Sequence, residues 1–442
     1  MAGLAIVLAG CAGTTSPSPS GAASPSASAP ASASASAGSA SPSGSAPASS
    51  AAASPSGEPI VVGSTLSLTG PFGATGKIHE LAGNMFVERL NASGGLLGRP
   101  VEWTVIDDES VTENVAPAYE RLISQDQVDL IMGPYATPNI LAAMTVAERN
   151  SMVLPQHTSV IAPLMNYDCQ FPAWSIGPDP NVFIPNLLLD AVATLPTPPT
   201  KIAIVTVQNG SALFIREGLA DDPNDDGMAS IAADKGLDVV LDVAYPLGTT
   251  DWGSLATQIR DADPDLLVSL SLGVDTVGQI QALKQLNADV PLTFSLFPAP
   301  GPLQGLGADG EGVMSVSIFE PSEKALTAIG GDAAAIVEEF STRATTAQLY
   351  PVFETQAAAS WNAWEILVAG VEAAAAVDDH EAICDALHQN GATTTFSGQL
   401  TFDPEDNNFW PTTLGLKQIQ DGEWVMVFPE ASAAAPIQGP QN

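Results

Sequence analysis

Residues 60–77 read IVVGSTLSLTGPFGATGK, and this stretch decides the fold class. A short apolar run predicts a strand over 59–66, and the glycine-dotted loop leads into helix-spaced apolar residues over 77–90. The loop ends in Gly-Lys, as a phosphate-binding loop does, but Pro71 stands where that motif needs its first glycine and Ile78 where it needs Ser or Thr. Proline also lacks the N–H that such a loop would use. The stretch therefore predicts a strand, a loop and a helix without a nucleotide site.

Strand and helix patterns continue to alternate after this unit, in two series. In the first series, strands are predicted at 101–106, 128–132 and 152–154, and helices at 113–124 and 138–149. In the second series, strands are predicted at 201–207, 239–244, 266–270 and 292–296, and helices at 214–220, 255–262 and 277–286. Such alternation is typical of parallel, doubly wound α/β sheets. Two series predict two Rossmann-like lobes, with ligands beyond the carboxyl ends of the strands.

The charge balance argues against two classes of partner. The chain of 442 residues has 13 Lys and Arg against 49 Asp and Glu, a formal charge of −36. Nucleic acid is bound mainly through basic side chains that neutralise phosphates, and an anionic membrane surface attracts polybasic segments. An acidic protein that works outside the cytoplasm fits this balance better.

The N-terminus, MAGLAIVLAGC, is a short apolar stretch that ends in small residues and a cysteine. An export signal has this form, and residues 8–11 resemble the bacterial lipobox, in which Cys11 is lipidated. No Lys or Arg precedes the apolar stretch, which leaves the true start codon open. Residues 12–57 are almost wholly Ser, Ala, Pro, Gly and Thr, so we expect a disordered spacer. Together they predict a protein anchored by lipid to the outer face of the cell membrane.

Five short motifs occur in a fixed order along the chain. They are STLSLTGP at 64–71, RLNASGGLLG at 89–98, IDD at 106–108, GPY at 133–135 and FSGQLTFD at 396–403. In their order and spacing they resemble the branched-chain amino-acid-binding family of ABC-importer solute receptors, and the likeness covers about residues 58–430. Such proteins are two-lobed clamps that close on a small solute and present it to a permease and its ATPase subunits.

The resemblance implies three hinge crossovers, near residues 180, 320 and 413. Lobe 1 is then expected at 58–181 and 320–413, lobe 2 at 182–319 and 414–430, and a flexible tail at 431–442. Cys169 and Cys384 both fall in lobe 1, which leaves a disulfide between them open. We expect a monomer that binds no cofactor and has no catalytic residues.

The opening loop and the start of the helix at 138–149 are the expected ligand site. Thr137 suits the N-cap of that helix and Pro138 its first position, which a plain helix cap explains fully. A helix start aimed into a cleft also favours a carboxylate. The side chains expected at this rim are Phe72, Thr75, Tyr135, Ala136 and Thr137.

The resemblance also implies how an amino acid would be held. Thr137, His157 and Ser159 match positions that hold the carboxylate, and a slip of one residue would bring in Thr158. Asp179 matches the aspartate that accepts the ligand's ammonium group. Two alternatives remain open: a packed loop histidine at 157, and an Asp-Pro turn at a hinge for Asp179.

Two expected positions depart from the family's amino-acid pocket. A tyrosine and an acid are usual in lobe 2, where this chain has Gly273 and Phe297. Without the acid, the ammonium group loses part of its counter-charge. Leucine, isoleucine and valine are therefore doubtful ligands, and an aromatic solute, an amide or a carboxylate is at least as plausible.

The acidic segment at 222–227 begins like a calcium-binding loop, with acids or amides at alternate positions and glycine sixth. The twelfth position is Ala233, so the bidentate glutamate is absent. A solvated acidic turn is the favoured interpretation. A weak calcium site would use Asp222, Asn224 and Asp226.

Two other functions compete with an import receptor. A secreted hydrolase needs a nucleophile with its base or a metal set, and neither HExxH nor G-x-S-x-G occurs. A sensor that signals to a membrane partner needs only the same closing clamp, so the sequence leaves this alternative open.

Overall fold

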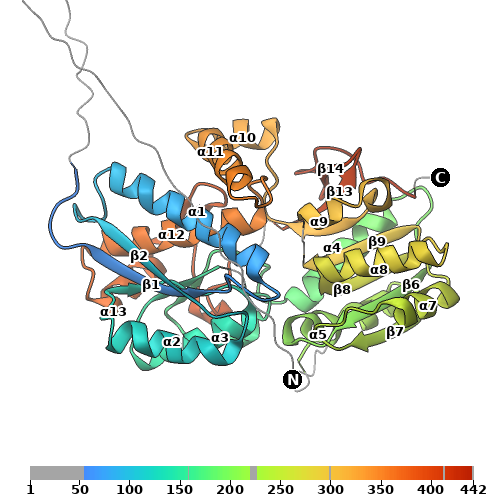
Figure 1. Cartoon of the computed structure of the whole chain (residues 1–442), viewed down its shortest axis with the longest axis horizontal. Coiled ribbons are helices and arrows are strands. Elements are labelled where there is room, and N and C mark those ends of the chain that lie inside the picture. Colours follow the sequence, from blue (N-terminus) through green and yellow to red (C-terminus); the bar gives the residue numbers. More distant parts are fainter. Residues whose placement is uncertain (1–53, 158, 220–225, 298–299, 412–413, 441–442) are drawn as a thin grey trace, which may run out of the picture. The chain divides into compact units, whose positions relative to one another are not determined.

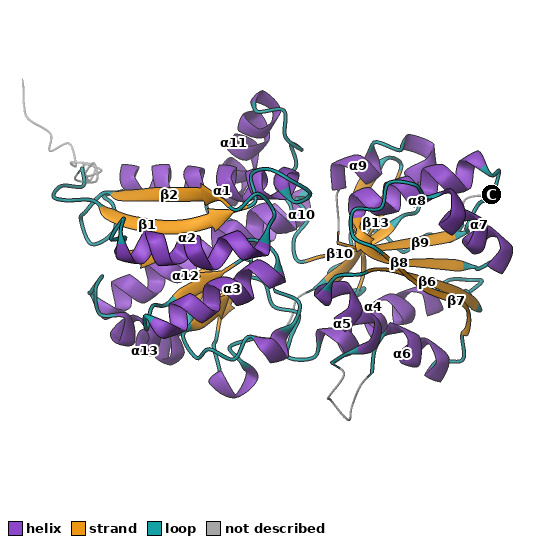
Figure 2. Ribbon diagram, turned by 60° about the horizontal axis from the view of Figure 1, so that its bottom comes forward, coloured by secondary structure: helices purple, strands orange, loops and turns teal. Residues whose placement is uncertain are grey.

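The computed structural model describes residues 54–157, 159–219, 226–297, 300–411 and 414–440. Contacts group these residues into one compact unit. Within it, two α/β lobes are each built on a mainly parallel sheet, as Figure 1 and Figure 2 show. The two-lobed α/β class predicted from the alternating patterns is therefore confirmed.

The first lobe contains a parallel sheet in the order β2-β1-β3 and a separate parallel pair, β4-β5. The backbone N–H of Gly133 donates to Pro155 O at 2.7 Å, which links the end of β3 to β4. The strands are β1 (Ile60–Leu66), β2 (Val101–Asp107), β3 (Leu130–Ile131), β4 (Leu154–Gln156), β5 (Gln170–Pro172) and the hairpin β11 (Ala392–Thr394) with β12 (Gly398–Leu400). The helices are α1 (Gly73–Ala92), α2 (Thr112–Ser124), α3 (Thr137–Arg149), α10 (Glu323–Ile329), α11 (Ala333–Thr346), α12 (Thr355–Ala374) and α13 (His380–Asn390).

The second lobe contains a seven-stranded sheet in the order β14-β13-β10-β9-β8-β6-β7. Its strands are parallel from β10 to β7, and β13 and β14 add an antiparallel edge. The strands are β6 (Lys201–Val207), β7 (Asp238–Tyr245), β8 (Leu266–Leu272), β9 (Leu292–Phe297), β10 (Met314–Ser317), β13 (Gly415–Gln420) and β14 (Glu423–Phe428). The helices are α4 (Pro180–Ala193), α5 (Gly210–Glu217), α6 (Met228–Asp234), α7 (Gly253–Ala262), α8 (Gly273–Gln285) and α9 (Pro300–Gln304).

Several helix starts differ from the sequence predictions. Helices α1 and α8 begin at Gly73 and Gly273, each four residues before the predicted start. We predicted α5 from residue 214, but it begins at Gly210, because the Asn209 side chain accepts a hydrogen bond from Ala212 N at 2.8 Å and caps it. We predicted Thr137 as the N-cap of α3, but Thr137 is the first helical residue. Ala136 precedes it with a φ of +74°, and this turn starts the helix one residue early.

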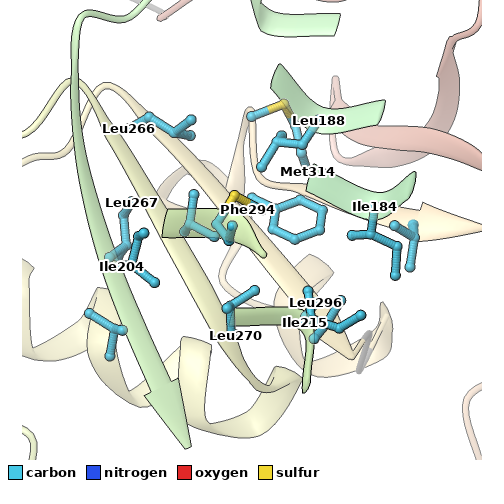
Figure 3. Packing of buried hydrophobic residues seen from close by; sticks show 14 of the residues in the cluster. Ile184, Leu188, Ile204, Ile215, Leu266, Leu267, Leu270, Phe294, Leu296 and Met314 are labelled. Atoms are coloured by element: carbon cyan, nitrogen blue, oxygen red, sulfur yellow. The ribbon is translucent and has the colours of Figure 1, made fainter. Parts of the chain in front are cut away.

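Each lobe has its own hydrophobic core. In the second lobe, strands β6, β8 and β9 lie between helices and contribute fully buried residues, of which Figure 3 shows Ile204, Leu267 and Phe294. The parallel strands are apolar on both faces, as a sheet covered by helices on both sides requires. In the first lobe, α1 and α12 pack side by side, and Trp361 and Trp364 from α12 contact Phe86 from α1.

The chain passes between the lobes three times: from β5 to α4, from β10 to α10, and from β12 to β13. Buried polar side chains meet where the second and third passages lie close together. Lys417 from β13 forms an ion pair with Glu320, and Ser317 Oγ donates to the same carboxylate at 2.9 Å. We call Ser317, Glu320, Glu354, Thr355 and Lys417 the crossover cluster; all five are buried.

A disulfide joins Cys169 to Cys384, with the two Cα atoms 5.4 Å apart. It ties the loop before β5 to α13 across a sequence separation of 215 residues. The pairing that the sequence left open is therefore present. The predicted lipidation site, Cys11, lies outside the described residues. Of the predicted spacer, residues 12–57, only 54–57 are described. Of the helices in the described part, none combines the length and the apolar character that a membrane span requires.

Candidate functional site

A cavity of about 140 Å³ has walls from both lobes. All of its residues except Gln356 lie at or shortly after the carboxyl ends of the strands β1 to β9, where ligands of open α/β sheets bind. The lining residues are Phe72, Ser110, Thr112, Tyr135, Ala136, Thr137, Pro138, Val160, Trp174, Asn209, Ser211, Leu247, Leu272, Phe297 and Gln356.

The start of α3 forms one wall of this cavity. Ile140 N is the first in the helix to bond back, to Ala136 O at 3.0 Å, so the N–H groups of Thr137 and Asn139 precede the helical ladder and Pro138 has none. The hydroxyl of Thr137 accepts a hydrogen bond from Val160 N at 3.1 Å. This bond holds the loop after β4 against the helix start and leaves the positive end of the helix dipole at the cavity.

Two aromatic side chains form the adjacent wall. The rings of Phe72 and Tyr135 meet edge to face, with centroids 5.8 Å apart. Phe72 N donates to Ser110 Oγ at 3.1 Å, which ties the glycine-rich loop to the segment after β2. Burial raises the pKa of the Tyr135 phenol to about 12, so its hydroxyl stays protonated at neutral pH.

Two buried histidines lie behind Tyr135. The rings of His79 and His157 are 4.5 Å apart, and His79 is 5.1 Å from the ring of Tyr135. Burial lowers the pKa of His157 to about 4, and burial together with the neighbouring His157 holds the pKa of His79 well below its usual range. Both imidazoles are therefore neutral at pH 7. His79 Nε2 contacts Gln356 Oε1 at 3.0 Å, and Gln356 lines the cavity.

Carboxylates behind the loop after β2 are fully engaged with the protein. Asp108 is buried and accepts hydrogen bonds from Ser67 Oγ at 2.5 Å and Asn139 Nδ2 at 3.3 Å. Its burial raises the pKa of the carboxyl group, against the effect of these hydrogen bonds. Asp107 accepts from the backbone N–H of Leu68 at 2.9 Å and of Glu109 at 2.8 Å. Both carboxyls therefore hold the loops in position.

Trp174 contributes an unusual donor to the lining. Its side chain is only 3% exposed, and its indole Nε1 has no hydrogen-bond partner among the described residues. A buried N–H without a partner costs free energy, on the order of 1–3 kcal/mol. The orphan donor therefore marks a position where a ligand acceptor would be favourable.

Five of the residues expected at the site line the cavity: Phe72, Tyr135, Ala136, Thr137 and Phe297. The others lie elsewhere, and their binding roles stay predictions. Thr75 is half-buried on α1 beside Tyr135, while His157 and Ser159 are fully buried behind the wall. Asp179 is exposed before α4, and Gly273 is buried at the start of α8 next to the lining residue Leu272. Thr158 lies outside the described residues.

Sequence reasoning missed the lining residues of the second lobe other than Phe297. In the first lobe it missed Ser110, Thr112, Val160, Trp174 and Gln356. Asn209, Leu247 and Leu272 each end or follow a strand that the sequence predicted, so the rule for the carboxyl ends of parallel strands could have found them. Neither Trp174 nor Gln356 follows a strand that the sequence predicted, so this rule could not have found them. They lie close to chain passages between the lobes, and only the tertiary fold brings them to the cavity.

The acidic loop offers no described metal site. Asp222 and Asn224 lie outside the described residues, and Asp226 uses its backbone carbonyl to accept from Asn181 Nδ2 at 2.7 Å. Among the residues that the structure describes, no group of three or more His, Cys, Asp or Glu side chains could hold a metal ion.

Two α/β lobes with a cavity between the carboxyl ends of their strands are the architecture of a solute-binding protein. The chain belongs to the periplasmic binding protein family, whose sequence pattern matches residues 59–422. This family has a binding fold without enzymatic activity, so the chain is a periplasmic or extracellular binding protein and not an enzyme.

The chain is similar to several known members. The chemotactic signal transduction system substrate-binding protein BasB of Halobacterium salinarum is 25% identical over 273 residues, which are 59% of this chain and 62% of that protein, less than two thirds of its length. An ABC transporter solute-binding protein from R. palustris, solved with benzoate, has a TM-score of 0.69 at 18% identity over 86% of this chain and 98% of its own. The branched-chain amino acid transporter protein LivJ from Streptococcus pneumoniae, solved with isoleucine, has a TM-score of 0.65 at 18% identity over 87% and 100%. These structures show the fold.

Proposed function

We propose that this protein is an extracytoplasmic receptor that closes on one small polar solute and delivers it to an ABC import permease and its ATPase subunits. The solute is an amino acid, an amide or a small carboxylate. The observation that carries the proposal is the cavity whose walls come from both lobes, because a ligand there would touch both halves and hold them together. In this proposal, a lipid on Cys11 and the spacer after it anchor the receptor to the outer face of the membrane.

The start of α3 is the proposed place for a ligand carboxylate. The N–H groups of Thr137 and Asn139 precede the helical ladder, and the helix dipole adds an attraction of about 0.3–1 kcal/mol when exposed and ~2 when partly buried. Phe72 and Tyr135 pack against the rest of the ligand.

A titration of the full chain against amino acids, amides, short acids and aromatic acids tests this function. We expect one solute per chain, and a thermal shift that corresponds to about 2.7 kcal/mol when the solute is at 100 times its dissociation constant. Phe72→Ala removes a wall of the cavity and should weaken binding at least tenfold, about 1.4 kcal/mol. The control is Leu164→Ala, an exposed apolar residue outside the lining, which should leave affinity unchanged. Binding that Phe72→Ala leaves intact would place the solute elsewhere.

A sensing receptor is the second candidate, and the match to the chemotactic protein of Halobacterium salinarum favours it. Both functions need the same clamp, so the membrane partner decides between them. If the protein serves import, cells that lack it should take up far less labelled solute than cells that express the full chain. Unchanged uptake together with a lost behavioural response to the solute would establish sensing.

A further inference from the structure

The cavity has an uncharged lining. Among the fifteen described residues that line it, none is Asp, Glu, Lys, Arg or His. Its polar members are hydroxyl and amide side chains, and four of its members are aromatic: Phe72, Tyr135, Trp174 and Phe297. A buried ligand charge must therefore be met by backbone groups or by neutral donors and acceptors.

Three carboxyl groups near the cavity, those of Asp108, Glu354 and Asp179, lie outside its lining. The Asp108 carboxylate accepts a hydrogen bond from the backbone N–H of the lining residue Ser110 at 3.0 Å, and it also accepts from Ser67 Oγ and Asn139 Nδ2. Glu354 accepts from the N–H of the lining residue Gln356 at 3.2 Å, and its burial raises the pKa of this carboxyl to about 7. Asp179 is exposed and outside the lining. Glu354 Oε2 is buried without a partner among the described residues, but Glu354 is not part of the lining. The lining itself therefore offers no carboxylate partner to a ligand ammonium group.

Donors, in contrast, are present and unused. Trp174 Nε1 is buried, has no partner among the described residues and belongs to a side chain that lines the cavity. The N–H groups of Thr137 and Asn139 lie at the start of α3, ahead of its first helical hydrogen bond. These two observations are independent, and both favour a ligand with an acceptor group, above all a carboxylate.

The size and the aromatic walls suit a single ring. An engineered apolar cavity of about 150 Å³ admits benzene, and this cavity measures about 140 Å³. Phe72 and Tyr135 already meet edge to face, an arrangement that a third ring can extend.

We propose that the solute is a single-ring aromatic monocarboxylate without an amino group, and that the cavity rejects the α-amino acid of the same skeleton. The proposal rests on the proposed function and names the substrate class of the same site. The ring lies against Phe72, Tyr135 and Phe297, and the carboxylate accepts from Trp174 Nε1 and from the start of α3.

Calorimetry of the full chain with phenylacetate, 3-phenylpropanoate and phenylalanine tests the proposal, because 3-phenylpropanoate has the carbon skeleton of phenylalanine and lacks only its α-ammonium group. We expect 3-phenylpropanoate to bind at least tenfold tighter than phenylalanine. We expect phenylacetate or benzoate to bind one per chain, at least tenfold tighter than phenylalanine. If phenylalanine or leucine binds as tightly as the aromatic acids, the substrate class is wrong and the receptor function stands. If no solute of the whole panel binds, the receptor function fails, and the substrate class with it.

A conservative variant tests the donor. Trp174→Phe keeps the ring and removes the indole N–H, and should weaken phenylacetate at least fivefold. Trp364→Phe is the matched control, because Trp364 Nε1 is also buried without a described partner but lies outside the lining. Equal affinity in the two variants would overturn the role of Trp174.

A second pair of variants tests whether the absence of a carboxylate from the lining sets the specificity. Phe297→Asp introduces a carboxylate into the lining, and Phe297→Asn introduces the same shape without charge. Each protein is first shown to be folded by its cooperative thermal transition. We expect the ratio of phenylalanine to phenylacetate affinity to rise at least tenfold in Phe297→Asp relative to Phe297→Asn. An unchanged ratio would contradict the proposal that an absent carboxylate sets the specificity.

Discussion

The cavity and the crossover cluster differ in the charge and the hydrogen bonding of their buried polar side chains. The cavity lining is uncharged, and at least one of its donors, Trp174 Nε1, has no described partner. The crossover cluster contains a buried ion pair: Lys417 is fully buried against Glu320, which also accepts from Ser317 Oγ. Of the buried oxygen and nitrogen atoms of the cluster's side chains, Glu354 Oε2 has no partner among the described residues. Ser317 in turn shares a hydrogen bond of 2.7 Å with Thr355 Oγ1. The difference indicates that the cluster serves the protein's own structure, whereas the cavity keeps hydrogen-bonding capacity for a ligand.

The two regions are connected through one short segment. Gln356 lines the cavity and contacts His79, and its N–H donates to Glu354 of the crossover cluster. The segment that begins α12 therefore carries both a ligand wall and a buried carboxyl at a chain passage between lobes. Changes in the cluster should act mainly on stability, and changes in the lining mainly on binding.

The largest expected effect comes from Lys417→Met. The variant leaves Glu320 buried without its cation, and loss of one partner of a buried pair typically costs about 3–5 kcal/mol. Urea unfolding of the full chain measures the loss. Lys284→Met is the control, because Lys284 pairs with Asp289 at the surface and should cost about 1 kcal/mol or less. Similar losses in both variants would mean that the cluster is no more important than a surface pair.

Glu354→Gln should change how stability depends on pH. Burial raises the folded-state pKa of Glu354 to about 7, above its ordinary value of 4.5, with Lys417 opposing and Glu320 adding to the shift. The folded state therefore holds a proton that the unfolded state has lost, and this carboxyl lowers stability as pH rises from about 4.5 to 7. Glutamine does not titrate, so the variant should gain on the wild type over that range, by about 3 kcal/mol at most.

Denaturation at pH 5 and pH 8 measures the gain, and Glu338→Gln on the exposed face of α11 reports the effect of one lost surface charge. A difference between Glu354→Gln and wild type that stays constant with pH would show that Glu354 is not held protonated.

His157→Asn, behind the cavity, should change the pH dependence of stability in the opposite direction, because wild-type stability falls here as the pH is lowered. Burial lowers the folded-state pKa of His157 to about 4, so the unfolded state binds the proton first as pH falls below 6.5. Wild-type stability should therefore decline from pH 6.5 towards 4, by about 3 kcal/mol at most from this residue. Asparagine can keep a donor towards Pro134 O, the partner of His157 Nδ1, and the variant should lose less at acid pH. An identical acid profile for both proteins would place the sensitivity elsewhere, with His79 as the next candidate.

The smallest expected effect on stability comes from the lining itself. Phe72→Leu removes an edge-to-face pair with Tyr135, worth about 0.5–1.5 kcal/mol beyond area. Thermal unfolding without ligand should shift little, while ligand affinity falls clearly. A loss of stability as large as that of Lys417→Met would mean that the cavity wall is a structural core.

The sequence could predict most of the strands, because parallel strands covered on both sides are continuous apolar runs. The strand predicted at 201–207 is β6 with the same ends, and the run at 266–270 falls inside β8. The first residues of the helices were harder to predict, because the cap of a helix depends on one backbone angle or on one side-chain hydrogen bond. The φ of +74° at Ala136 and the cap by Asn209 each moved a start.

The residues of the candidate site were predictable only where they come soon after a predicted strand in the sequence. Phe72, Tyr135 and Thr137 follow the first and third strands closely in the chain, so the rule for parallel sheets indicated them. Trp174 and Gln356 come from separate chain segments, and the pairing of Lys417 with Glu320 joins residues 97 positions apart. No local pattern specifies such contacts.

A crystal structure of the full chain grown with phenylacetate tests the central claim most directly. We predict one molecule of the acid between the lobes, with its ring against Phe72 and Phe297 and its carboxylate within hydrogen-bond distance of Trp174 Nε1. The acid bound to one lobe alone, or bound at any place away from the start of α3, would contradict the account.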